Sequence, residues 1–176
     1  MTAATHRSGT DRIAEAVASL QLTPDAIVVN IQGDQPVFEP TQVDEVIAPL
    51  LADPSINMST LIYKIIRDEE ITHPNAVKVA FDYNGFALYF SRHSIPFIRD
   101  EKPAEIIHYK HIGLYGYTKD FLFTYKALAE SKLEKLEKLE QLRILENGYR
   151  IKLVETSFET FGVDTPEDLE KVKQRL

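Results

Sequence analysis

Residues 26–36 read AIVVNIQGDQP, an apolar run that changes abruptly into a polar loop. The β-branched stretch 26–29 is typical of a strand buried on both faces, and Gly33 and Pro36 end that strand. Neither of them requires the carboxylate of Asp34 to lie between them. Because ligands bind beyond the C-terminal ends of strands in open α/β sheets, Asp34 stands where a site residue is expected.

The chain on either side alternates between helical and strand patterns. Before the strand at 26–31, one helical face carries Ile13, Ala16, Val17 and Leu20. The remaining expected elements are a helix opened by a capping box of Thr41 and Asp44, a strand at 58–66, a hairpin at 77–90, a strand at 108–117, helices at 119–129 and 132–147, a strand at 150–154 and a final helix opened by Asp164. This order predicts one α/β domain over residues 1–176, with a mixed sheet and an inserted β-hairpin.

Composition excludes several classes of protein. The 176 residues are 44% hydrophobic and 27% charged, which suits a folded domain with a real core. The net charge of −7 gives no broad attraction for nucleic acid. The sequence contains no membrane-spanning run, no signal-peptide core and no cysteine, which rules out disulfides and Cys-rich zinc sites. We therefore expect a cytoplasmic protein that binds neither nucleic acid nor membrane.

The run KLEKLEKLEQLR at 132–143 resembles a coiled coil at first sight. Its leucines recur every three residues, however, and not in the 3–4 alternation of a heptad seam. At 3.6 residues per turn, such a stripe drifts around the helix by about 60° per step. The pattern favours a helix of a globular domain that is buried on one side.

Seven strings occur in order along almost the whole chain: HRSGTDR, NIQGDQP, NAVKV, ALYFSR with SIP, HIGLYGY, LEKLEQLR and GVDTPEDL. Together they resemble the 3-deoxy-manno-octulosonate cytidylyltransferases, also called CMP-Kdo synthetases, which activate the acidic sugar Kdo for lipopolysaccharide assembly. The resemblance implies a Rossmann-like nucleotidyltransferase fold and a homodimer. It also implies a reaction in which the anomeric hydroxyl of Kdo attacks the α-phosphorus of CTP and pyrophosphate leaves.

Family members begin with a strand and a loop rich in Gly, Arg and Lys that wraps the CTP phosphates, followed by a helix and a second strand. The resemblance therefore implies that this chain is N-terminally truncated and lacks the first βα units. Two alternatives remain beside Kdo activation. The chain could be a cytidylyltransferase for another acidic sugar, such as a sialic-acid-like one, or a non-catalytic truncated fragment that still binds ligand or dimerises.

The resemblance also assigns residues to a metal site. Mg²⁺ is a hard cation that takes carboxylate and phosphate oxygens, and by resemblance Asp34 and Asp164 are its ligands and the catalytic residues. Each has another possible role. Asp34 could bond its own backbone in a turn, and Asp164 could cap the helix that follows it.

The substrate-binding residues follow from the same resemblance. It assigns Ser8, Gly9, Thr10 and Arg12, at a helix N-terminus, to the nucleotide, although Ser8 could equally be an ordinary N-cap. Kdo is an anion with many hydroxyl groups, so its pocket needs a guanidinium and several neutral hydrogen-bond partners. The resemblance places the following residues around it: Gln32, Arg92, His111, Tyr115, Glu140 and Gln141.

Overall fold

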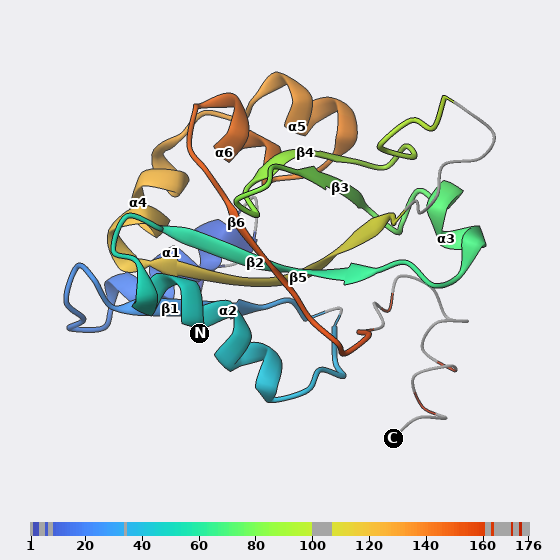
Figure 1. Cartoon of the computed structure of the whole chain (residues 1–176). Coiled ribbons are helices and arrows are strands. Elements are labelled where there is room, and N and C mark those ends of the chain that lie inside the picture. The colour runs from blue at the N-terminus through green and yellow to red at the C-terminus, as the bar shows by residue number, and fades with distance from the viewer. Residues whose placement is uncertain are drawn as a thin grey trace.

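The computed structural model describes residues 2–3, 6, 9–33, 35–99 and 107–160, and the single residues 163, 170 and 173. Figure 1 shows a twisted sheet with helices on both of its faces. The strands are β1 (Ile27–Ile31), β2 (Met58–Lys64), β3 (Lys78–Phe81), β4 (Ala87–Ser91), β5 (Tyr109–Thr118) and β6 (Lys152–Glu155). The helices are α1 (Gly9–Ala18), α2 (Thr41–Ala52), α3 (Asp68–Thr72), α4 (Lys119–Ala127), α5 (Lys132–Glu137) and α6 (Leu142–Glu146).

The sheet is mixed, in the order β4-β3-β5-β2-β6, with β1 also paired to β5. Strands β2 and β6 are parallel and the other pairs are antiparallel. Because β2 lines one edge of β5, β1 and β3 must share the opposite edge. Strand β1 pairs with residues 114–118 and β3 with residues 109–110. Between these two pairings lie His111, Ile112 and Gly113, and Gly113 lies beside the loop that follows β1.

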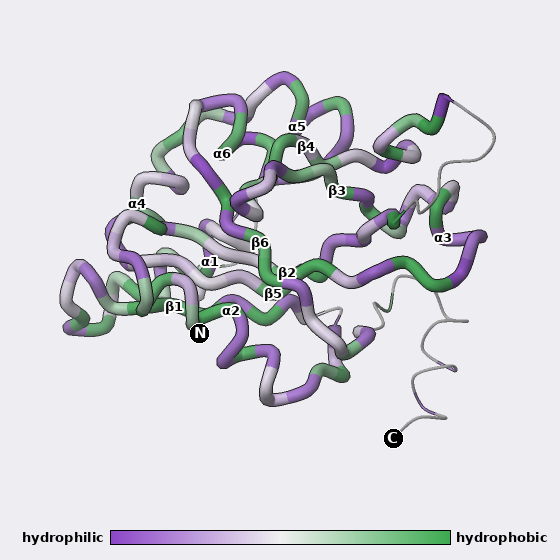
Figure 2. Tube along the Cα trace, viewed as in Figure 1, coloured by the Kyte–Doolittle hydropathy of each residue, from purple (hydrophilic) through white to green (hydrophobic). Residues whose placement is uncertain are grey.

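Two separate cores cover the two faces of the sheet. On one face, Val46 of α2 packs with Leu61, Ile112 and Leu114. On the other, residues of α1, α4 and the segment 139–144 pack against the strands. Figure 2 shows α2 with alternating apolar and polar stretches, as expected for a helix with one buried face. The expected α/β class and the inserted hairpin, now β3 and β4, are confirmed.

No helix within the described residues is long and apolar enough to cross a membrane.

The expectation that β1 is buried on both faces is only partly confirmed. Val28 and Asn30 are buried, whereas Ile31 is 40% exposed. In the described pairing, β1 contacts β5 alone, so it lies at the margin of the sheet. Val28 packs into the core on one face, and the partly buried Val29 packs against the α2 core on the other. Its apolar composition therefore overstated its burial.

The expected helix at 132–147 is two helices. Helix α5 ends at Glu137, and Lys138 takes the left-handed conformation, with φ of 54°. This break turns the leucine stripe back toward the core, because Leu136 is 71% exposed while Leu139 and Leu142 are buried. A continuous helix would have carried these leucines progressively away from the sheet.

The buried face of α1 also differs from expectation. In α1 the buried residues are Thr10, Ala14 and Val17, whereas Ala16 and Leu20 are exposed.

The capping box expected for α2 does not form. Thr41 is already the first helical residue, Pro40 occupies the N-cap position, and no side chain caps the helix there. Instead, the side-chain Oε1 of Gln42 accepts a hydrogen bond of 3.0 Å from the backbone N–H of Glu39.

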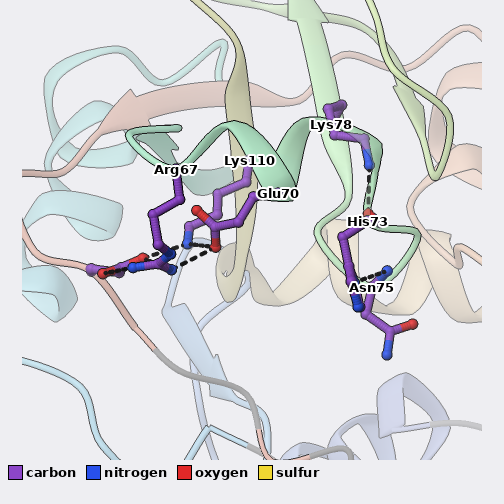
Figure 3. Close-up of polar contacts among 7 residues, drawn as sticks. Arg67, Glu70, His73, Asn75, Lys78 and Lys110 are labelled. Atoms are coloured by element: carbon purple, nitrogen blue, oxygen red, sulfur yellow. Dashed lines mark hydrogen bonds and ion pairs between the residues drawn. The ribbon is translucent and has the colours of Figure 1, made fainter.

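Four charged side chains attach the segment after β6 to the rest of the fold. Oε1 of Glu159 accepts hydrogen bonds of 2.6 Å from both Arg67 Nη2 and Lys110 Nζ. The same two cations contact Oε1 of Glu70, at 2.7 and 2.6 Å (Figure 3). Lys110 and both carboxylates are largely buried. This ion-pair cluster therefore joins α3, β5 and the chain that leaves β6.

Candidate active site

Several of the expected site residues come together on the face of the sheet that α1 covers. Thr10 of α1 is buried, and its hydroxyl donates a hydrogen bond of 2.9 Å to Oε2 of Glu140. His111 and Tyr115 of β5 lie with their ring centroids 5.3 Å apart. Gln32 lies beside the start of α1, because a Cβ built on Gly9 would be 3.6 Å from its Oε1.

The Glu140 carboxyl lies in a partly desolvated position. Burial raises its pKa, while the hydrogen bond from Thr10 and the charge of Arg143 oppose that rise. Nearby, burial also raises the pKa of Tyr117, whose hydroxyl accepts a hydrogen bond of 3.4 Å from Asn30 Nδ2. A carboxyl with a raised pKa beside neutral polar groups is suited to binding hydroxyl groups.

His111 packs against two aromatic rings. The Phe90 ring meets it edge-on at a centroid distance of 5.2 Å, and the Tyr115 ring is tilted against it at 5.3 Å. Its Nε2 lies 2.9 Å from the hydroxyl oxygen of Thr60. Burial lowers the pKa of His111 to about 3, so the ring is neutral at physiological pH.

The loop after β1 passes close to β5 at a glycine. A Cβ built on Gly113 would lie 3.0 Å from Gln35 Nε2 and 3.6 Å from Gln32 Cγ. The β5 strand also bulges here, since Thr60 pairs with Tyr115 while Leu61 pairs with Ile112. The glycine and the bulge together allow the loop that carries Gln32 to approach the sheet.

The Arg92 guanidinium is not free in this structure, because three backbone carbonyls accept hydrogen bonds from it. Its Nε donates to the backbone oxygen of Glu137 at 2.7 Å, Nη1 to that of Pro74 at 3.0 Å, and Nη2 to that of Lys138 at 3.4 Å. Arg92 follows β4 directly, so these hydrogen bonds connect the C-terminal end of α5 to the end of β4. Five N–H groups are available on a guanidinium, so two remain beyond these three bonds.

The other expected residues lie apart from these contacts or outside the described residues. Arg12 is exposed, and its Nη1 donates to the Thr2 hydroxyl at 2.8 Å. Gln141 is buried just before α6. Ser8 and both expected metal ligands, Asp34 and Asp164, lie outside the described residues. Within the residues that are described, no group of three or more acidic or histidine side chains could hold a metal.

Comparison with known proteins identifies the family. A family model described as cytidylyltransferase matches residues 1–153. A 3-deoxy-manno-octulosonate cytidylyltransferase from Syntrophus aciditrophicus is 62% identical over 176 residues, which are the whole of this chain and 71% of that relative. This chain belongs to the 3-deoxy-manno-octulosonate cytidylyltransferase family. A second member, from Geobacter metallireducens, is 50% identical over 185 residues, covering all of this chain and 72% of the relative.

Solved structures agree with this family assignment. A CMP:2-keto-3-deoxy-manno-octonic acid synthetase in complex with CTP is 39% identical and superposes with a TM-score of 0.89, over all of this chain and 72% of that one. A 2-C-methyl-D-erythritol 4-phosphate cytidylyltransferase from Francisella tularensis is 13% identical, with a TM-score of 0.57 over 97% of this chain and 69% of that one. The second likeness shows the nucleotidyltransferase fold alone.

The sequence did not predict that three polar residues of this cytidylyltransferase chain would be buried near the candidate site. Thr60, Lys78 and Asn30 are all buried within strands. Lys78 Nζ donates to the backbone oxygen of His73 at 2.7 Å, and burial together with nearby Arg92 lowers its pKa (Figure 3). The available signal was a polar residue inside an apolar strand, which is costly unless the residue has a partner.

Proposed function

We propose that the chain transfers the cytidylyl group of CTP to Kdo, forming CMP-Kdo and pyrophosphate for lipopolysaccharide biosynthesis. The observation that carries the proposal is the likeness, over the whole chain, to a synthetase structure that contains CTP. In the reaction, the anomeric oxygen of the sugar bonds to the α-phosphorus and loses its proton, and the bond from that phosphorus to the β-phosphate oxygen breaks. The protein must hold two polyanionic or acidic substrates together in line.

The chain's own residues can bind the sugar in this scheme. His111, Tyr115 and Gln32 supply neutral hydrogen-bonding groups on one face of the sheet, as a polyhydroxylated ligand requires. The two remaining N–H groups of Arg92 are the proposed partners of the sugar carboxylate. Because three backbone carbonyls already hold this guanidinium, it is fixed in place before substrate arrives.

Glu140 and Gln141 complete the proposed sugar pocket from the other side. Glu140 is fixed by the Thr10 hydroxyl, which itself lies in the first turn of α1. This contact links the sugar side to the proposed nucleotide side, formed by Ser8, Gly9, Thr10 and Arg12. Free backbone N–H groups at a helix N-terminus favour polar or anionic ligand groups.

We propose Asp34 and Asp164 as the protein ligands of Mg²⁺. The donor set fits, since carboxylate oxygens are hard ligands and Gln35, next to Asp34 in the chain, donates its backbone N–H to the carbonyl of Gln32 at 3.0 Å. Bound Mg²⁺ supplies neutralisation of the triphosphate charge and acidification of a coordinated hydroxyl.

A panel of acidic sugars tests the substrate. The chain is incubated with CTP, Mg²⁺ and either Kdo or a sialic acid, and the nucleotide products are identified by mass spectrometry. CMP-Kdo as the main product supports the proposal. A CMP-sialic acid product favours the alternative sugar, and the absence of any CMP-sugar favours a non-catalytic ligand-binding role.

The association state and location are also proposals. We propose a cytoplasmic homodimer whose contact lies in the second half of the chain. The exposed Leu136 in that half supports this, together with the exposed Leu88 at the end of the first half, because exposed apolar side chains favour association. Size-exclusion chromatography with light scattering distinguishes a dimer from a monomer, and a monomer at high concentration contradicts the proposal.

A further inference from the structure

Thr60 lies under the proposed sugar site at a point where two strands are out of register. It is fully buried in β2, opposite the bulge of β5. Its hydroxyl oxygen lies 2.8 Å from the backbone oxygen of Leu114, 3.1 Å from that of Ile112 and 2.9 Å from Nε2 of His111. Three polar atoms therefore surround one hydroxyl group that water does not reach.

The number of protons decides how these atoms pair. A threonine hydroxyl has one proton and two lone pairs, and a carbonyl oxygen can only accept. If the single proton points at a carbonyl, the lone pairs of the hydroxyl face His111. A bare Nε2 would then place its own lone pair against those of the oxygen, which is repulsive. The pairing is satisfied only when Nε2 carries a proton and donates it to Thr60.

We propose that Thr60 is a positioning residue that holds His111 in the Nε2–H tautomer, so that the bare Nδ1 is presented as a hydrogen-bond acceptor to a sugar hydroxyl. The Thr60 hydroxyl donates its hydrogen bond to the carbonyl oxygens of the β5 bulge and accepts one from the imidazole Nε2–H. The second part of this role, toward the sugar, rests on the proposed function. The first part concerns the chain without any ligand.

The neutral state of the ring makes this tautomer meaningful. Burial disfavours the protonated imidazolium, so His111 has one proton to place on either nitrogen. Among the described residues, the hydrogen bond recorded for the ring is the one at Nε2. When the proton is fixed on Nε2 before substrate binds, Nδ1 accepts a hydrogen bond from a ligand donor. Its lone pair repels a ligand acceptor placed at the same position.

Nitrogen-15 NMR of the histidine rings in the ligand-free chain measures the tautomer directly. The resonances of His111 are assigned by their loss in His111→Gln. A protonated Nε2 and an unprotonated Nδ1 are expected in the wild-type chain. In Thr60→Val, Nε2 loses its acceptor while Nδ1 can donate to water, so a measurable Nδ1–H population is expected; Thr60→Ser keeps the wild-type pattern.

Ser59→Ala is the matched control. Ser59 is also a buried hydroxyl of β2, but it donates to the Val46 backbone oxygen on the opposite face of the sheet. Its loss should leave the His111 tautomer unchanged. An Nδ1–H tautomer in the wild-type chain, or an unchanged tautomer in a folded Thr60→Val, overturns the proposal.

Kinetics with Kdo test the second part. Loss of one oriented hydrogen bond should raise the KM for Kdo by about tenfold in Thr60→Val, with the KM for CTP unchanged and with recovery in Thr60→Ser. Equal rises for both substrates indicate a general structural effect and overturn the positioning role. A shifted tautomer in Thr60→Val without turnover of any acidic sugar supports the hold of Thr60 on His111 and overturns the proposed function instead.

Discussion

At the residue scale, His111 shows how burial controls charge in the site. Its folded-state pKa is about 3, whereas an unperturbed histidine has a pKa of about 6.5. Between these values the unfolded chain binds a proton that the folded chain does not. The free energy of unfolding therefore falls as the pH drops through this window, by at most about 1.4 kcal/mol per pH unit.

Replacing this histidine should remove that part of the acid sensitivity. Urea unfolding of His111→Gln, measured above and within the window, should show a smaller loss of stability on acidification than the wild-type chain. His93→Gln, at an exposed position, should keep the wild-type loss. The same pH dependence in His111→Gln and the wild-type chain would contradict the buried, neutral ring.

Arg92 is expected to contribute to stability as well as to binding. Arg92→Lys keeps the charge but loses the fork that reaches the carbonyls of Glu137, Pro74 and Lys138. We expect the free energy of unfolding to fall by about 2 kcal/mol, the usual range for hydrogen bonds to charged groups. Arg99→Lys, at an exposed position, should change it by less than about 0.5 kcal/mol. Similar stabilities of the two variants would show that the three bonds are not formed in solution.

At the element scale, local patterns predicted which segments are helices and strands but not where long-range contacts interrupt them. The Asn84-Gly85 turn was predicted from the sequence, and the structure agrees, since Gly85 has a φ of 72° that favours glycine. The break at Lys138 was not. At that point Arg92, just after β4 and distant in the sequence, contacts the carbonyls at the end of α5. The α2 capping box does not form because the helix begins one residue early, with Pro40 at the N-cap position, and the neighbouring Gln42 bonds to the Phe158 carbonyl after β6.

The ion-pair cluster is expected to stabilise the connection between α3, β5 and the chain after β6. Glu159→Gln leaves Lys110, which is largely buried, with a single carboxylate partner. We expect a loss of about 2 kcal/mol in the free energy of unfolding, since unpairing a buried charge is costly. Glu130→Gln removes an exposed pair with Lys135 and should cost less than about 1 kcal/mol. Equal costs in urea unfolding would mean that burial of the cluster adds nothing.

The close approach at Gly113 gives a second test at this scale. In Gly113→Ala the new methyl group would lie 3.0 Å from Gln35 Nε2 and 3.6 Å from Gln32 Cγ, so the end of the Gln35 side chain must shift. We expect weaker binding of Kdo, by up to about tenfold in the dissociation constant measured by calorimetry, because the methyl group also contacts Gln32. Gly148→Asn serves as a control, since asparagine tolerates its φ of 78° and no atom lies near. Unchanged Kdo binding by Gly113→Ala would place the loop outside the sugar site.

At the scale of the whole molecule, the sequence predicted the fold class and the order of elements better than their pairing. The sharing of one edge of β5 by β1 and β3 brings the loop after β1 next to Gly113, two residues from His111. No local pattern encodes that neighbourhood, because it arises from strand pairing between distant segments. The resemblance to a family named Gln32 and His111 together, whereas Thr60 became visible only through its contacts.

Cytidylyl transfer by the whole molecule is expected to depend on Asp34. The most direct measurement is pyrophosphate release from CTP and Mg²⁺ by this 176-residue chain, with and without Kdo. We predict release that requires Kdo, is abolished in Asp34→Asn and persists in Asp53→Asn, whose carboxylate accepts a hydrogen bond from the Ser55 backbone. Failure of the wild-type chain to release pyrophosphate, or full release by Asp34→Asn, would contradict the account.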